Sequence, residues 1–195
     1  MAVQEKFRCD FDYIALLDSF SNDPYLVFLD SSDPNSSSSI FSYIGFDPFL
    51  TLTVKRDVTL IHYRGGDTFS LKGNPLDIIQ TYLSKYHDPT LLPFTAGAIG
   101  SFSYESARFL EDFKFIRPSL VEHEITLGFY DKVLVYHHPS QECNLYFTRF
   151  LDLNNQFSFH DFHNKVSMTV DQSEDYDIGD FSLDIALDDY SKKVD

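Results

Sequence analysis

The residues best suited to chemistry in this sequence flank a serine-rich stretch near the N-terminus. Leu29, Asp30 and Ser31 end a predicted strand, and Ser42 follows the serine-rich residues 31–39. A carboxylate beside hydroxyl groups can hold an ammonium ion, which is consistent with a small pocket for an amino acid. The alternative is a strand-end turn in which Asp30 hydrogen-bonds its own backbone. On the residues alone, the turn is favoured.

Other reactive side chains lack the spacing that catalysis or metal binding needs. His160 and His163 share a helical spacing but have no cysteine partner. His137 and His138 point to opposite faces of a predicted strand, so they cannot both bind one ion. The segment Gly97–Gly100 lacks the lysine of a phosphate-binding loop. The residues therefore predict no catalytic group, metal ligand or resident cofactor.

The two cysteines, Cys9 and Cys143, are too few for a disulfide framework and have no metal-type spacing. No secretory signal is visible within Met1–Asp10, and no stretch approaches the ~18 apolar residues of a transmembrane helix. We therefore expect a reduced, soluble protein in the cytoplasm.

Charge and composition exclude further classes. The chain has 195 residues, of which 43% are hydrophobic, enough to bury a core. Its 15 Lys and Arg against 30 Asp and Glu give a formal net charge of −15. This field repels phosphate backbones and anionic membrane surfaces, so neither nucleic acid nor membrane is expected as a partner.

The elements that position these residues are mostly predicted strands. Tyr25–Leu29 has the composition of a short buried strand, and Leu50, Leu52 and Val54 alternate with polar residues. The short links near residues 56 and 65 predict hairpins and hence an antiparallel meander, because parallel strands need longer crossovers.

Helical spacing appears in three places. Residues 11–17 can form a short helix, and 159–170 place apolar side chains on one helical face. Between them, Asn74 can cap a helix that has Pro75 in its first turn. Strands with a few packed helices give an α+β class, with antiparallel sheets.

The C-terminal region differs in composition. Residues 171–186 form an acidic segment typical of a solvated linker. Residues 187–195 have the pattern of a helix start, with acidic residues in the first turn. We expect a domain over residues 1–170, then this linker, then the truncated start of a second domain.

Several short segments occur in a characteristic order: Phe28–Ser31, Phe41–Phe49, Gly73–Leu76, Pro93–Gly100, Tyr104–Glu105, Arg108–Glu111 and Gly128–Asp131. Together they resemble the N-terminal region of component I of the chorismate-utilising enzymes, anthranilate synthase and aminodeoxychorismate synthase. The resemblance implies a sandwich-like anthranilate synthase component I N-terminal-type domain. It also implies that the catalytic groups and the Mg²⁺-binding carboxylates belong to a C-terminal chorismate-binding domain that is missing here. This chain alone should then be inactive.

The same resemblance implies partners and a ligand. The partners are a glutamine amidotransferase subunit and the missing chorismate-binding domain, and the ligand is L-tryptophan. By position, Leu29, Asp30, Ser31 and Ser42 match the tryptophan-contacting motifs. Ile40 stands where the family usually has an arginine, so any salt bridge made by that guanidinium is lost.

The run Leu29-Asp30-Ser31 resembles the aminodeoxychorismate branch, because anthranilate synthases generally carry Glu in the middle position. We therefore expect a part of an enzyme of folate and p-aminobenzoate biosynthesis, which converts chorismate and glutamine-derived ammonia to 4-amino-4-deoxychorismate. One alternative is the N-terminal part of anthranilate synthase component I, with a feedback site for tryptophan biosynthesis. Another is a stand-alone module that binds tryptophan or docks a glutaminase.

Overall fold

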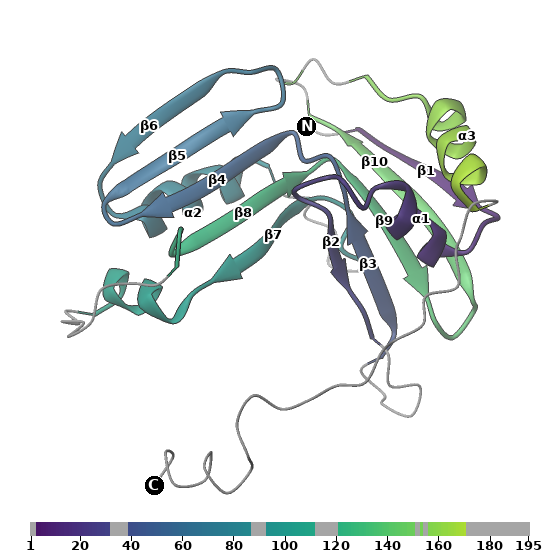
Figure 1. The fold of residues 1–195 in the computed structure, drawn as a ribbon, viewed down its shortest axis with the longest axis horizontal. Helices are drawn as coiled ribbons and strands as arrows, with labels where there is room; N and C mark the ends of the chain where they lie inside the picture. Colours follow the sequence, from purple (N-terminus) through teal and green to yellow (C-terminus); the bar gives the residue numbers. More distant parts are fainter. Residues whose placement is uncertain are drawn as a thin grey trace, which may run out of the picture.

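The computed structural model describes residues 3–31, 39–86, 93–111, 121–150, 153 and 156–170. Within them, ten strands form two five-stranded sheets (Figure 1). The spatial order in the first sheet is β1 (Val3–Cys9), β10 (Glu142–Arg149), β9 (Lys132–His137), β3 (Phe41–Gly45) and β2 (Val27–Leu29). In the second sheet it is β6 (Thr68–Lys72), β5 (Val58–Tyr63), β4 (Leu50–Lys55), β8 (Ile125–Tyr130) and β7 (Gly97–Phe102).

All strand pairs are antiparallel, and the predicted meander is confirmed as the run β4, β5 and β6. The helices are α1 (Tyr13–Ser19), α2 (Pro75–Lys85) and α3 (Phe159–Val170), with a 3₁₀ helix η1 (Tyr104–Phe109). Figure 1 shows α1 and α3 beside the first sheet and α2 beside the second. The predicted α+β class is therefore confirmed. The linker and second-domain start predicted for residues 171–195 lie outside the described residues.

Local signals explain α2. Asn74 Oδ1 accepts a hydrogen bond from the backbone N–H of Leu76 at 3.0 Å, and Pro75 occupies the first turn, where no N–H is needed. Ile79 is buried against the second sheet. None of the described helices is both long and apolar enough to cross a membrane.

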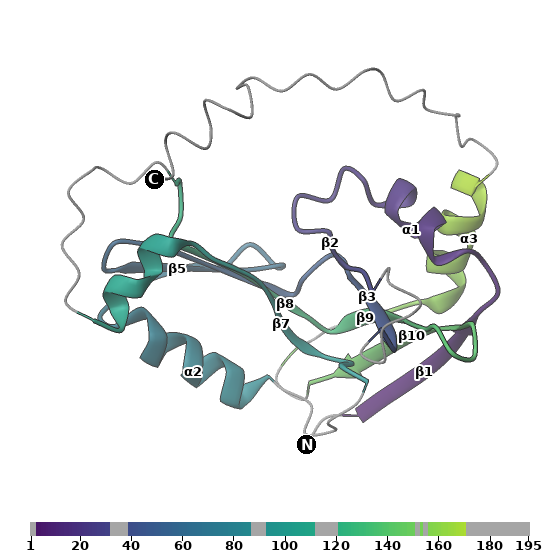
Figure 2. The same cartoon turned by 90° about the horizontal axis from the view of Figure 1, so that it is seen from below.

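Two neighbouring strand pairs run through both sheets. β3 pairs with β9 in the first sheet. The next strand after β3, which is β4, pairs in the second sheet with β8, the strand just before β9. The chain passes from one sheet to the other at residues 46–49 and again at Asp131. Figure 2 shows β5, β7 and β8 of the second sheet on the left and β3, β9 and β10 of the first sheet on the right. Asp47 has a φ of 44°, a left-handed conformation that Asp tolerates better than most residues.

The core lies on three sheet faces. Side chains of the second sheet pack on α2, with Leu50, Leu52, Ile61 and Phe129 fully buried. The first sheet packs one face on α1 and α3; its buried members are Cys9, Leu16, Ile44, Phe46, Leu134, Cys143, Leu145, Phe162 and Val166. Its other face carries a smaller cluster around Tyr130.

Candidate functional site

The end of β2 and the start of β3 bring Asp30, Ser31 and Ser42 together. Ser42 Oγ donates a hydrogen bond to Asp30 Oδ1 at 2.7 Å and accepts one from the backbone N–H of Ser31 at 3.0 Å. Ser31 Oγ donates to the carbonyl oxygen of Phe41 at 2.8 Å. Asp30 is exposed and Ser42 is buried, so the carboxylate lies at the surface and the hydroxyl that it contacts is shielded from solvent. Asp30 Oδ1 is therefore bound to a side chain of β3.

His138 joins this polar cluster from the turn after β9, a contact that sequence reasoning missed. Its Nε2 lies 2.8 Å from Ser42 Oγ, and its backbone N–H donates to the carbonyl oxygen of Ile40. Since Ser42 gives its single proton to Asp30, Nε2–H of His138 must donate to the hydroxyl. The order of donation is therefore His138 to Ser42 to Asp30. The sequence did contain a signal for this contact. Successive side chains of a strand point to opposite faces, so one of His137 and His138 had to lie on the face that carries Ser42.

Two tyrosines cover the cluster from the side of α1. The ring of Tyr13 stacks on that of Tyr136 with centroids 4.4 Å apart, and Tyr136 meets the ring of His138 edge-on at 4.9 Å. Burial raises the pKa of Tyr13, and the nearby charge of Asp30 raises it further. Tyr13 therefore stays neutral at physiological pH, and its ring provides an apolar surface beside the polar cluster.

Leu29 is separated from the other three predicted site residues. It pairs with Tyr43, which lies on the opposite face of β3 from Ser42. There it lines a cavity of about 290 Å³ together with Tyr43, Phe94, Ala98, Ile99 and Gly100. The period of two along a strand thus splits the predicted set between two faces of the sheet.

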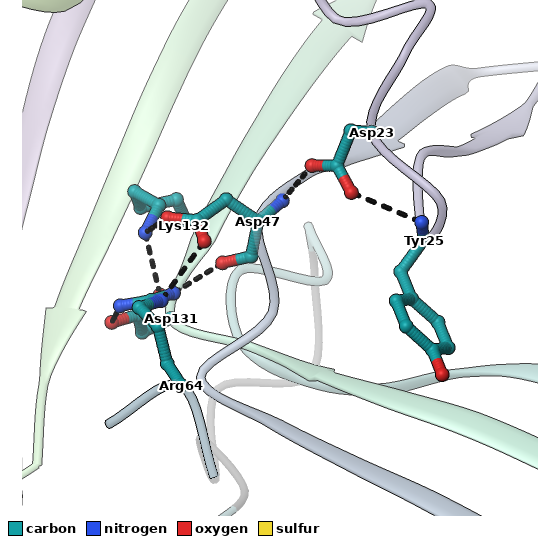
Figure 3. A network of polar contacts seen from close by, with 6 residues as sticks. All are labelled: Asp23, Tyr25, Asp47, Arg64, Asp131 and Lys132. Atoms are coloured by element: carbon teal, nitrogen blue, oxygen red, sulfur yellow. Dashed lines mark hydrogen bonds and ion pairs between the residues drawn. The ribbon is translucent and has the colours of Figure 1, made fainter. Parts of the chain in front are cut away.

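A second polar group of residues lies where the chain bends between the two sheets (Figure 3). Arg64 Nε donates to Asp47 Oδ1 and Arg64 Nη2 to Asp131 Oδ1, both at 3.0 Å. Lys132 Nζ lies 2.8 Å from Asp47 Oδ2 and 3.2 Å from Asp131 Oδ1. We call these four residues the corner network. It ties both bends, at Asp47 and Asp131, to one another.

The corner network is balanced in charge and only partly buried, because the side chains of Asp47 and Arg64 are 49% and 31% exposed. The side chain of Asp131 is fully buried and that of Lys132 is 6% exposed. Burial opposes the charge on Arg64, but the hydrogen bonds and charge of Asp131, with the charge of Asp47, raise the pKa of Arg64 above its ordinary value. Arg64 and Lys132 also line a cavity of about 830 Å³. Two cations matched by two carboxylates favour a structural role for the network.

The family resemblance places the Mg²⁺-binding carboxylates in the chorismate-binding domain, so no magnesium site is expected in this part of the chain. Mg²⁺ needs several oxygen ligands in octahedral geometry, whereas Asp47 and Asp131 already accept hydrogen bonds from Arg64 and Lys132. Among the described residues, no group of three or more His, Cys, Asp or Glu side chains could hold a metal ion. The residues present do not fit this ion.

Tyr130 explains two glycines of the segments that carry the family resemblance. Its buried ring lies so close to β3 and β8 that a Cβ at Gly45 would be 2.9 Å from Tyr130 Cδ1. A Cβ at Gly128 would be 2.5 Å from Tyr130 Oη. The hydroxyl donates to the carbonyl oxygen of Tyr25 at 2.6 Å, and burial raises the pKa of Tyr130. These segments therefore serve packing between the sheets.

Comparison with known proteins gives partial matches, although no protein-family model matches the sequence. Anthranilate synthase component 1 of Acetivibrio thermocellus is 30% identical over 140 residues, which cover 68% of this chain and 28% of that protein. Aminodeoxychorismate synthase component 1 of Salmonella typhimurium is 32% identical over 132 residues, covering 63% and 28%. The chain therefore spans less than a third of the length of these curated relatives.

Among solved structures, anthranilate synthase component I from Streptococcus pneumoniae TIGR4 aligns with a TM-score of 0.49 and 17% identity, over 76% of this chain and 32% of that one. The assignment rests on the sequence relatives, in which both enzyme names recur at 30 to 34% identity. On that evidence, the chain belongs to the component I family of chorismate-utilising enzymes, the family of anthranilate synthase and aminodeoxychorismate synthase.

Proposed function

We propose that this chain is the non-catalytic, N-terminal portion of component I of an aminodeoxychorismate synthase. The complete enzyme joins chorismate and ammonia to give 4-amino-4-deoxychorismate and water, in the cytoplasm. The observation that carries the proposal is the match to component 1 proteins over about two thirds of the chain. The neutral corner network is consistent with a scaffold, because its carboxylates are occupied by Arg64 and Lys132.

Asp30 supports the aminodeoxychorismate branch within this proposal. The run Leu29-Asp30-Ser31 resembles that branch, and Asp30 Oδ1 accepts a hydrogen bond from Ser42 Oγ at 2.7 Å. Anthranilate synthase component I is the second candidate, because relatives with that name match at similar identity.

The test is the product made by the complete open reading frame that contains this chain. With chorismate and ammonium, we expect 4-amino-4-deoxychorismate, identified by mass spectrometry, and Mg²⁺ dependence supplied by the chorismate-binding domain. With glutamine in place of ammonium, we expect turnover only after a glutamine amidotransferase subunit is added. Formation of anthranilate would assign the other branch, and no consumption of chorismate would refute both.

We also propose that Asp30 binds the ammonium group of an amino acid, with L-tryptophan as the probe. Oδ1 of Asp30 is held by Ser42, and Oδ2 has no hydrogen-bond partner among the described residues. An exposed carboxylate oriented in this way can accept a charge-assisted hydrogen bond from an ammonium group. The rings of Tyr13 and Tyr136 provide apolar surface beside it.

Asp30→Ala is expected to weaken tryptophan binding about tenfold or more, because a hydrogen bond between charged groups contributes roughly 1.5–3 kcal/mol. Isothermal titration calorimetry measures this loss. The matched control is Asp77→Ala, which removes an exposed carboxylate from α2, on the other sheet, and should leave the affinity unchanged. An absence of heat at millimolar tryptophan, or equal affinity of both variants, would remove this ligand from the proposal.

A further inference from the structure

The structure places the two cysteines of the chain on neighbouring strands, although they are far apart in the sequence. Cys9 on β1 and Cys143 on β10 are direct partners in the antiparallel ladder. Each is 6% exposed and each is a free thiol. They are the only cysteines in the sequence, so any disulfide within one chain must join these two residues.

Ladder geometry is compatible with a bond between the two sulfurs. Directly opposed residues of antiparallel strands have Cα atoms about 4.5–5.5 Å apart, and disulfides span Cα distances of about 4.4–6.8 Å. Side chains of opposed residues also point to the same face of the sheet. The proximity of Cys9, followed by burial, raises the pKa of the Cys143 thiol.

We propose that Cys9 and Cys143 form a reversible cross-strand disulfide that fastens the edge strand β1 to β10. The oxidant is a small disulfide such as oxidised glutathione. One cysteine thiolate attacks it, forming a mixed disulfide and releasing one glutathione. The second cysteine then attacks the protein sulfur of the mixed disulfide and releases the second glutathione. Two protein thiols are oxidised, and their two protons end on the two glutathiones.

Opening of β1 should control the rate of this reaction. Burial disfavours the thiolate that must attack, so both sulfurs react only when the edge strand separates. β1 is held by a stack between the rings of Phe7 and Phe159, with centroids 4.6 Å apart, and by an ion pair of Glu5 with Arg149 at 3.0 Å. Phe7→Ala removes this ring stack and so loosens the strand, but it keeps both cysteines and the Phe7 carbonyl oxygen to which Cys9 Sγ donates at 3.9 Å.

The test uses the 195-residue chain with excess oxidised glutathione, followed by thiol counting in denaturant and intact-mass measurement. We expect loss of both thiols, a mass decrease of about 2 Da, and recovery with dithiothreitol. The melting temperature should rise by about 10 °C, since the bond closes a loop of more than a hundred residues. Phe7→Ala should oxidise several-fold faster than the unmodified chain.

Cys9→Ser and Cys143→Ser are the matched controls, because each leaves one thiol and neither can form the internal bond. They should show no decrease of about 2 Da and no rise in melting temperature. Two thiols that persist in Phe7→Ala at equilibrium would overturn the proposal. Stable glutathione adducts on the unmodified chain, or a dimer linked between chains, would also overturn it.

Discussion

Asp131→Asn is expected to lower the free energy of unfolding by about 3–5 kcal/mol, the range for removing one partner of a buried ion pair. The substitution keeps the shape of the side chain but removes its charge. Arg64 and Lys132 then share a single carboxylate, that of Asp47, at a site where Asp131 is fully buried. Urea denaturation followed by far-UV circular dichroism measures the change.

Asp161→Asn is the matched control for the loss of a carboxylate. Its side chain is 81% exposed and its contact to His160 is at 3.5 Å, so we expect a change within about 0.5 kcal/mol. Replacing Arg64 and Asp131 together by Met and Leu should recover part of the loss, because the remaining cation, Lys132, is then matched by the single carboxylate of Asp47. An Asp131→Asn variant as stable as the control would contradict a structural role for the corner network.

Tyr130→Ala should have an effect of comparable size, about 3–5 kcal/mol, because it removes a fully buried ring between the two sheets. The neighbouring glycines have no side chains with which to fill the cavity. Tyr130→Phe keeps the ring but leaves the carbonyl oxygen of Tyr25 without its 2.6 Å donor, so a loss of about 1 kcal/mol is expected. Chemical denaturation of both variants separates the two contributions.

Tyr104→Ala serves as the matched control, because that side chain is 82% exposed. Its unfolding free energy should change by no more than about 0.5 kcal/mol. If Tyr130→Phe cost as much as Tyr130→Ala, the hydroxyl contact would dominate, and our account of the ring as an inter-sheet spacer would be wrong.

Elements set by neighbouring residues were predictable from the sequence. Asn74 and Pro75 start α2 as expected, and the alternation over β4 and β5 identifies both strands. The short helix predicted over residues 11–17 occurs two residues later, as α1. Caps, turns and period-two patterns depend on residues that are close in the sequence, so they can be recognised without knowledge of the fold.

β1 was not predicted, because little of its stability is local. Val3–Cys9 carries Glu5, Lys6 and Arg8, and most of its side chains are exposed or half-buried. It becomes a strand by pairing along its whole length with β10, which lies at the other end of the described chain. Such pairing depends on contacts between residues that are far apart in the sequence, and the seven residues of β1 by themselves do not indicate these contacts.

The sequence by itself determined which residues flank the serine-rich stretch, and hence that Asp30, Ser31 and Ser42 lie near one another. Only the tertiary structure decided that Leu29 faces another cavity, that His138 completes the polar cluster, and that Cys9 and Cys143 are opposed in neighbouring strands. The physical reason is strand register. A shift of one residue moves every side chain of a strand to the opposite face, and register is set by partners far away in the chain.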